Sequence, residues 1–297
     1  MRIRQAFRQK PGGRIARGML PPLMAVFAVL WLAPLARGVE TPWQNHQDMV
    51  ETRLVGAPVG EGVGEGGGED GRWVYGWEAR LSPGWKTYWR SPGEAGLPVV
   101  ISREGEPVEV FYTLPERFEL FGLETYGYSK RVLLPFAPGN DVGGAEISVS
   151  FMVCKDICVP FDARYEIPRA TGQGGTPVTH GILLEQALAR VPDRTGDGGA
   201  GLTVISAAVT GPPGRQRLVV DAAAGAPLVF ADLMAEAGEG VHFGRPDTRL
   251  LDDGRRIRFV VPAMVMDKSS DLRGRQARLT FTDGRGHAID RLVRLND

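Results

Sequence analysis

Cys154 and Cys158 are the residues of this sequence whose type and spacing could do chemistry, and they are the only cysteines among its 297 residues. Three residues separate them. Two thiols this close in sequence can form a disulfide that exchanges with other thiols, form a structural disulfide, or bind a soft metal ion.

The spacing places a condition on the backbone that carries the pair. In an extended strand the two Cα atoms would lie about 13 Å apart at roughly 3.3 Å per residue, whereas a disulfide tolerates about 4.4 to 6.8 Å. A helix would bring the two positions together, but the β-rich flanks and Pro160 argue against one. We therefore predict a tight turn at Lys155 and Asp156, with Cys154 ending one strand and Cys158 beginning the next.

The size of the ring bears on what such a bond is for. Closing a loop of five residues contributes only about 2 kcal/mol to stability, against about 4.7 kcal/mol for a loop of 100 residues. A disulfide that closes a small ring therefore stabilises the fold little and is more easily reduced. The spacing favours a redox-active pair, while a structural disulfide and a soft-metal site stay open as alternatives.

The N-terminal residues have the composition of a secretory signal peptide. Residues 1–38 contain seven basic residues and no acidic one, an apolar stretch at 20–35, and small residues at Ala36 and Gly38. The apolar stretch is shorter than the roughly 20 residues that span a bilayer, so we predict cleavage after Gly38 rather than an uncleaved anchor. We expect the mature chain in the oxidising periplasm, without direct membrane insertion. Taking seven from the 35 basic residues leaves 28 against 35 acidic ones, which argues against nucleic acid as a partner.

The remaining sequence predicts an all-β fold in two blocks. Segments 73–79, 132–136, 147–151 and 165–167 alternate between apolar and polar residues and are separated by Pro/Gly-rich turns, as in a β-sandwich. Apolar residues at helical spacing over 179–191 predict a short connector helix that ends before Pro192, and strands resume beyond residue 201. We predict a signal peptide (1–38), a β-sandwich with the cysteine pair (39–170), a linker with the connector helix (171–200) and a second small β domain (201–297).

Several other motifs fail on inspection. Residues 62–67 fit G-x-G-x-x-G, yet acidic residues surround them and a strand follows, where a phosphate site needs a helix N-terminus. The four histidines have no zinc-ligand spacing, and no G-x-S-x-G sequence is present. We therefore expect no cofactor and no dedicated metal site.

Six segments in a fixed order carry a resemblance to a known family: residues 84–93, 96–98, 114–115, 125–128, 133–135 and 154–160. Together they make residues 73–168 resemble the N-terminal periplasmic domain of the thiol:disulfide interchange protein DsbD. Residues 179–297 resemble, more weakly, the additional β domain of the copper-tolerance (ScsB-like) branch of that family, through 228–232 and 280–284.

The resemblance implies an immunoglobulin-like sandwich that acts as a thiol:disulfide interchange component, a protein-disulfide reductase. Its disulfide would accept electrons from a membrane thiol reductase or a thioredoxin-like protein and pass them to periplasmic disulfide-containing substrate proteins. The chain shows no counterpart of the family's membrane channel or C-terminal thioredoxin domain, so we expect a separate reductase to supply the electrons. By position, Cys158 would exchange with partners and Cys154 would resolve the mixed disulfide.

The family also covers its cysteines with a cap loop, which falls here on residues 121–126. The resemblance makes Phe121, Glu124 and Tyr126 the candidate shielding residues and places Tyr88 near the pair. Thr125 stands at about the place of the family's cap aromatic.

Two other functions compete with thiol exchange. The first is copper binding or handling, because Met152, the two cysteines and the pair Met264 and Met266 are soft ligands suited to Cu(I). Methionines that fill a β core would explain the same residues. The second is an inert adaptor whose disulfide is structural.

Overall fold

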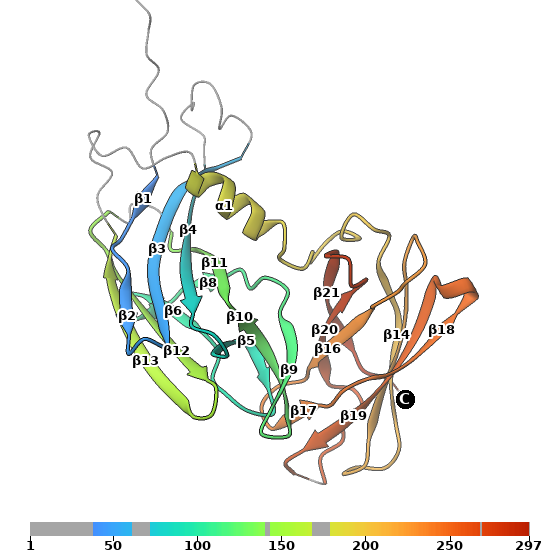
Figure 1. Ribbon diagram of the computed structural model, residues 1–297. Coiled ribbons are helices and arrows are strands. Elements are labelled where there is room, and N and C mark those ends of the chain that lie inside the picture. The colour runs from blue at the N-terminus through green and yellow to red at the C-terminus, as the bar shows by residue number, and fades with distance from the viewer. Residues whose placement is uncertain (1–37, 61–71, 140–142, 168–178, 268, 297) are drawn as a thin grey trace, which may run out of the picture. The chain divides into compact units, whose positions relative to one another are not determined.

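The computed structural model describes residues 38–60, 72–139, 143–167, 179–267 and 269–296 (Figure 1). The predicted signal peptide up to residue 37, the Gly-rich acidic loop and the predicted linker at 171–177 lie outside these ranges. Within the described ranges, no helix has the length and apolar composition needed to cross a membrane.

The first β region consists of two antiparallel sheets (Figure 1). The first sheet has the order β1-β3-β4-β11-β8, with β2 beside β3: β1 (Val39–Glu40), β2 (Gln44–His46), β3 (Val50–Val59), β4 (Arg72–Leu81), β8 (Glu109–Val110) and β11 (Arg131–Ala137). The second has the order β7-β6-β12-β5-β10-β9, with β13 beside β12: β5 (Lys86–Gly93), β6 (Val100–Arg103), β7 (Glu106–Pro107), β9 (Glu116–Leu120), β10 (Leu123–Ser129), β12 (Glu146–Cys154) and β13 (Cys158–Glu166).

Alternation along β12 shows why these sheets pack together. Ile147, Val149, Phe151 and Val153 point inward and are each at most 3% exposed, because successive side chains of a strand lie on opposite faces. They share one core with Trp77 of β4, on the opposite sheet. The predicted immunoglobulin-like sandwich is confirmed, and the predicted strands at 73–79, 132–136 and 147–151 lie within β4, β11 and β12.

The helix α1 (Thr179–Leu188) follows, close to the predicted 179–191. It packs on the first sheet, where Leu184 is buried with Val55, Ala57 and Val74. This contact explains why β4 is buried on both faces instead of only on the side of the sandwich core.

The second β region contains a further pair of sheets. One has the order β14-β15-β19-β17 with β18 beside β19, and the other the order β16-β20-β21. Their elements are β14 (Thr203–Thr210), β15 (Arg217–Ala223), β16 (Asp232–Glu236), β17 (Val241–Phe243), β18 (Asp247–Leu251), the 3-10 turn η1 (Asp252–Gly254), β19 (Arg256–Val265), β20 (Gln276–Thr282) and β21 (Ala288–Arg294). Leu218, Val220, Phe259 and Phe281 lie in its core, and β20 and β21 form an antiparallel hairpin.

Candidate functional site

The two cysteines form a disulfide at a hairpin end. Strand β12 ends at Cys154, strand β13 begins at Cys158, and the two residues are direct cross-strand partners with their Cα atoms 4.2 Å apart. The Lys155 amide donates a hydrogen bond to the Ile157 carbonyl across the turn, at 3.1 Å. The predicted tight turn at Lys155 and Asp156 is confirmed, and the helical alternative is excluded.

The two sulfur-bearing residues have opposite environments. Cys154 is fully buried, whereas Cys158 is exposed, as are the three turn residues between them. A thiolate approaching from solvent therefore reaches Cys158 first, and Cys154 is protected by the structure around it.

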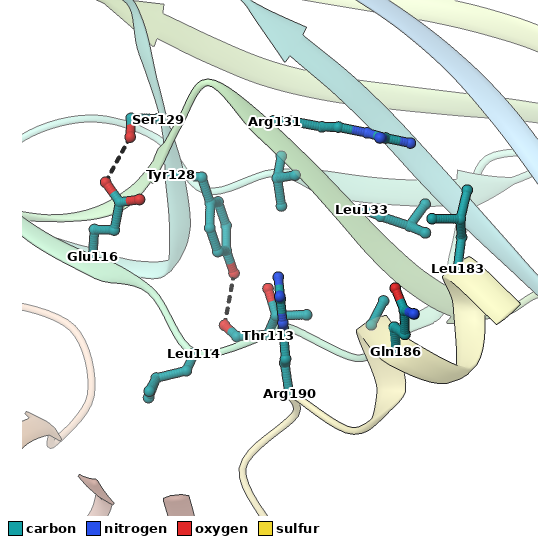
Figure 2. A pocket seen from close by; sticks show the side chains of 12 residues that line it. Thr113, Leu114, Glu116, Tyr128, Ser129, Arg131, Leu133, Leu183, Gln186 and Arg190 are labelled. Carbon is teal, nitrogen blue, oxygen red and sulfur yellow. Dashed lines mark hydrogen bonds between the residues drawn. The ribbon is translucent and has the colours of Figure 1, made fainter. Parts of the chain in front are cut away.

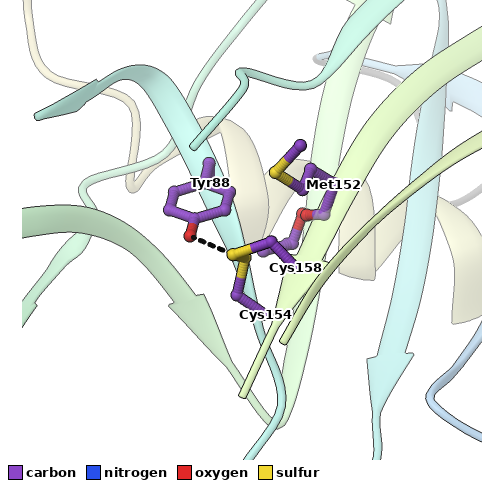
Figure 3. The surroundings of a disulfide bond; sticks show 5 residues. Tyr88, Met152, Cys154 and Cys158 are labelled. Atoms are coloured by element: carbon purple, nitrogen blue, oxygen red, sulfur yellow. Dashed lines mark hydrogen bonds between the residues drawn. A yellow bond between two sulfur atoms is a disulfide. The ribbon is translucent and has the colours of Figure 1, made fainter. Parts of the chain in front are cut away.

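Tyr88 lies directly beside the disulfide, as the resemblance implied (Figure 3). Its hydroxyl is 3.8 Å from Cys158 Sγ, and its ring is fully buried with Leu120 and Cys154, against Phe118 and Met152. Burial raises the pKa of Tyr88 above its usual value. The phenol therefore stays protonated at neutral pH and can donate a hydrogen bond to a thiolate at Cys158.

Gly96 makes the position of Tyr88 sterically possible. A Cβ atom at this residue would lie 2.3 Å from ring carbons of Tyr88, and its φ of +101° is one that residues with side chains rarely adopt. Close packing on Tyr88 thus explains why segment 96–98, which is part of the family resemblance, begins with a glycine. The chain passes over the tyrosine ring at a distance only glycine allows.

The predicted cap segment forms the end of the hairpin β9–β10. Phe121 stands at the turn with 65% of its surface exposed. Glu124 forms an ion pair with Arg117, and Tyr126 is buried in the sandwich core, edge-to-face with Trp89. These three residues do not belong to the buried cluster around Cys154.

Two neighbours of the predicted cap residues, Phe118 and Leu120, do belong to the buried cluster around Cys154. Leu120 is buried against Tyr88 and Cys154, and Phe118 packs on the same cluster. Thr125 is buried and donates to the Phe118 carbonyl at 2.9 Å, which holds the two hairpin strands together. Alternation would have placed Phe118 and Leu120 on one face of a strand, but only the fold shows which face meets the disulfide.

Lys86 is a further neighbour that sequence reasoning missed. It is the cross-strand partner of Cys154 on β5, and its ammonium group lies 4.2 Å from the centre of the Phe118 ring. Partners in a ladder point to the same face, with Cβ atoms about 5 Å apart. Its positive charge favours the thiolate form of a nearby cysteine. The only sequence signal for this residue was its place in segment 84–93.

The soft ligands of the copper alternative lie in different parts of the fold. Met152 packs beside the cysteine pair, whereas Met264 and Met266 belong to the second β region and are 41% and 81% exposed. The prediction that these methionines fill a β core therefore holds in part for Met152, which is partly buried, and is wrong for the exposed Met264 and Met266. Among the described residues, no group of three or more His, Cys, Asp or Glu side chains is arranged to hold a metal ion.

A cavity of about 330 Å³ lies beside α1, away from the cysteines (Figure 2). None of its lining residues belongs to the cluster around the disulfide. They come from α1 and the residues after it, from β10 and β11, and from the start of β9 and the chain before it: Thr113, Leu114, Glu116, Tyr128, Ser129, Arg131, Val132, Leu133, Leu183, Gln186, Ala187 and Arg190. The cysteine pair lies at the surface turn between β12 and β13, apart from this cavity.

Comparison with known proteins agrees with this geometry. Residues 70–169 match the family described as thiol:disulfide interchange protein DsbD, N-terminal. This part of the chain is therefore similar to the DsbD N-terminal domain. Residues 190–291 match a family described as a domain of unknown function (DUF8393). No curated protein sequence matches the chain.

A solved structure shares the fold of the DsbD-type domain and of the β region that follows it. It is the N-terminal periplasmic domain of ScsB from Proteus mirabilis, with a TM-score of 0.68 and 19% identity, covering 88% of this chain and 99% of that chain. The resemblance drawn from the sequence is confirmed in its family and in its fold, and it extends across both β regions.

Proposed function

We propose that this protein is a periplasmic thiol–disulfide exchange protein working through Cys154 and Cys158. It accepts electrons from a membrane thiol reductase or a thioredoxin-like protein and passes them to periplasmic proteins that contain disulfides. The observation that carries the proposal is the asymmetry of the pair, an exposed Cys158 bonded to a fully buried Cys154 in a surface turn.

Reduction of the pair begins at the exposed sulfur. A thiolate of the reduced partner attacks Cys158 Sγ, the bond between the two cysteines breaks, and Cys154 leaves as a thiolate that takes a proton from water. The partner's second thiolate then attacks its own sulfur in the mixed disulfide. The partner leaves with a disulfide, and two electrons have moved to the Cys154–Cys158 pair.

Transfer to a substrate runs through the same sulfur in the opposite direction. The Cys158 thiolate attacks a substrate disulfide, and one substrate sulfur leaves as a thiolate and is protonated. Cys154, held beside Cys158 by the β12–β13 ladder, then attacks Cys158 Sγ and releases the second substrate thiol. The protein returns to its oxidised form and the substrate is reduced.

Neighbouring side chains tune the thiolates. The Tyr88 hydroxyl donates to Cys158, and the charges of Lys86 and Lys155 favour the ionised form, which Asp156 opposes. The carboxylate of Glu124 is taken up by Arg117, so we propose a structural role for it instead of proton transfer.

Trapping of partners tests the assignment of the two cysteines. The reduced Cys154→Ala variant should attack a disulfide substrate and stay attached, because no second thiol resolves the intermediate, and Cys158→Ala should form no adduct. Non-reducing electrophoresis and mass spectrometry read the adduct, and the double variant is the control. If Cys158→Ala traps the substrate, the two roles are reversed.

A redox titration separates exchange from the inert adaptor. A midpoint potential near or above about −230 mV supports exchange, and one below about −300 mV supports a structural disulfide. Copper handling predicts a third result, in which Cu(I) binding to the reduced protein is lost in the cysteine double variant.

The remaining parts of the proposal concern location and organisation. We propose that residues 1–38 are removed as a signal peptide. We also propose that the mature chain consists of a redox domain at 39–170, a connector at 171–200 and a second domain at 201–297. The periplasmic location of the structural relative and the family of residues 70–169 support this arrangement.

A further inference from the structure

Arg117 connects the hairpin beside the disulfide to the second β region. It lies on β9, and its Nε and Nη2 donate to the two carboxylate oxygens of Asp232, the first residue of β16, at 2.9 and 2.8 Å. Its Nη1 donates to Glu124 and, at 2.9 Å, to the Tyr126 hydroxyl, both on β10. One guanidinium therefore holds three strands together.

The connection is largely shielded from water. The Arg117 side chain is 12% exposed, and Met234, two residues after Asp232, is buried in the same core as Tyr126. Burial by itself lowers the pKa of Arg117, but the hydrogen bonds that Arg117 donates to Asp232 and the negative charge of that carboxylate outweigh burial and raise the pKa above its ordinary value. The guanidinium of Arg117 stays charged, and removing Asp232 would leave this buried charge without its bidentate partner.

The same strand touches the disulfide cluster with its other face. Successive side chains of β9 point to opposite sides, so Arg117 faces the second β region while Phe118 and Leu120 face Tyr88 and Cys154. Strand β9 is therefore held from one side, and its other side packs on Tyr88 and the buried Cys154.

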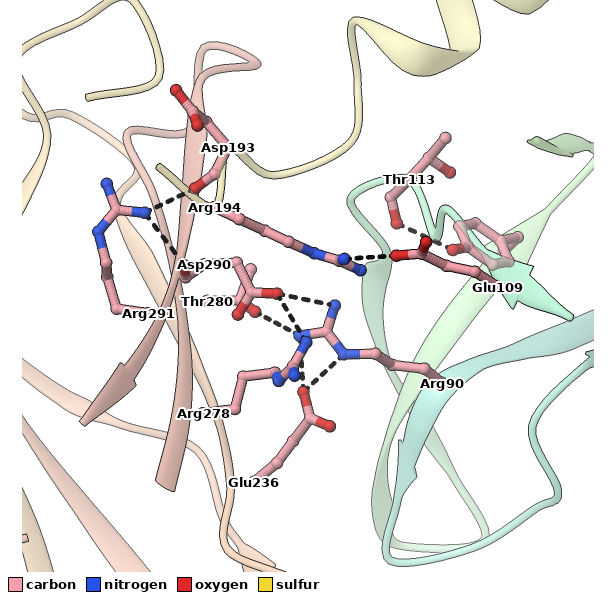
Figure 4. Close-up of polar contacts among 11 residues, drawn as sticks. Arg90, Glu109, Thr113, Asp193, Arg194, Glu236, Arg278, Thr280, Asp290 and Arg291 are labelled. Atoms are coloured by element: carbon pink, nitrogen blue, oxygen red, sulfur yellow. Dashed lines mark hydrogen bonds and ion pairs between the residues drawn. The ribbon is translucent and has the colours of Figure 1, made fainter. Parts of the chain in front are cut away.

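A second arginine connects the strand that carries Tyr88. Arg90, two residues further along β5, bonds Glu236 at 2.8 Å and Thr280 at 2.8 Å, and it lies 3.4 Å from Asp290 (Figure 4). Two arginines of the first β region thus meet three carboxylates of the second. Charge complementarity of this kind fixes the register in which two surfaces meet.

We propose that the second β region, through Asp232 and Arg117, holds the β9–β10 hairpin against Tyr88 and the buried Cys154 and so sets how fast the disulfide reacts. Arg117 acts here as a positioning residue, since it touches neither sulfur. The biological meaning of this clamp rests on the proposed function. By clamp we mean the Arg117–Asp232 contact, which couples the second β region to the reactivity of the disulfide.

The test uses the full chain and a small thiol, so that no physiological partner is required. Asp232→Asn keeps the shape of the side chain and removes its charge. Its disulfide should be reduced by dithiothreitol about five to ten times faster than in the unaltered protein, at the lower end of the usual range for coupling between two sites. Amide hydrogen exchange over residues 116–127 should become faster to a similar degree.

A matched control exists within the second β region. Asp221 makes an equivalent bidentate pair with Arg258, at 2.7 and 2.8 Å, without contact to the hairpin. Asp221→Asn should leave the reduction rate and the exchange over 116–127 unchanged. In the double variant Arg117→Met, Asp232→Asn, the rate should not exceed that of the faster single variant, because both changes break one contact.

Two results would overturn the clamp. One is an unchanged dithiothreitol rate in a folded Asp232→Asn variant, and the other is an equal acceleration in Asp221→Asn. If Asp232→Asn fails to fold, Arg117→Lys takes its place, since a lysine keeps the charge but cannot bond both strands at once. The dithiothreitol rate reports the clamp even if the titration assigns the disulfide to a structural role, so the two proposals fail separately.

Discussion

Removing the Tyr88 hydroxyl should raise the pKa of the Cys158 thiol by roughly one unit. The hydroxyl of the buried Tyr88 lies 3.8 Å from Sγ of the exposed Cys158, and a hydrogen bond to a charged group contributes about 1.5 to 3 kcal/mol. Because this contact is long, we take the lower figure of about 1.5 kcal/mol. At 1.36 kcal/mol per unit, that corresponds to a shift of about one unit.

The expected change in reactivity is smaller than the change in thiolate population. One unit lowers the thiolate fraction about tenfold at a pH below the pKa. A thiolate of higher pKa is intrinsically more nucleophilic, with a Brønsted coefficient of about 0.4 to 0.5, so the alkylation rate of Tyr88→Phe at pH 7 should fall only about three- to fourfold. The pH midpoint of alkylation should move upward by the full unit.

The assay isolates Cys158 in the Cys154→Ala background and follows iodoacetamide alkylation by mass spectrometry from pH 6 to 10. Tyr128→Phe is the matched control, because Tyr128 is also buried but donates to the Thr113 carbonyl instead of to sulfur. An identical midpoint in the Cys154→Ala protein with and without Tyr88→Phe would refute the role given to the hydroxyl.

Three further predictions follow from the same structure and sequence. Leu120→Ala should lower the free energy of unfolding by about 2 kcal/mol, as for a buried leucine near a surface, and denaturant titration measures this. Its disulfide should also be reduced faster by dithiothreitol. An unchanged reduction rate would mean that Leu120 does not shield the disulfide. Burial between Phe151 and Phe161 lowers the pKa of His46, so the unfolded chain binds a proton more readily and stability should fall as the pH drops below about 6.5. Urea unfolding should therefore show that His46→Gln loses less free energy of unfolding between pH 7 and pH 5 than the unaltered protein does. An equal loss would mean that groups other than His46 cause the pH dependence. N-terminal sequencing of the periplasmic protein should begin near Val39, and finding Met1 there would contradict cleavage.

Local pattern determined much of this protein. Alternation of apolar residues predicted β4, β11 and β12, and helical spacing predicted α1, because these signals act over a few neighbouring residues. The turn at Lys155 and Asp156 was also predictable, because two cysteines four positions apart cannot bond in an extended strand and Pro160 with its β-rich flanks argued against a helix.

Only the tertiary structure decided what surrounds the disulfide. The cysteine pair meets Leu120 and Phe118 instead of Phe121, and it pairs across the ladder with Lys86, because strand pairing selects one face and one register from several that the sequence allows. The contact of Arg117 with Asp232 spans 115 positions, and no periodicity extends over such a separation. Chemistry that depends on two residues a few positions apart, such as Cys154 and Cys158, can be found in the sequence. Contacts between that site and charged residues far away in the sequence are set by how the strands pack.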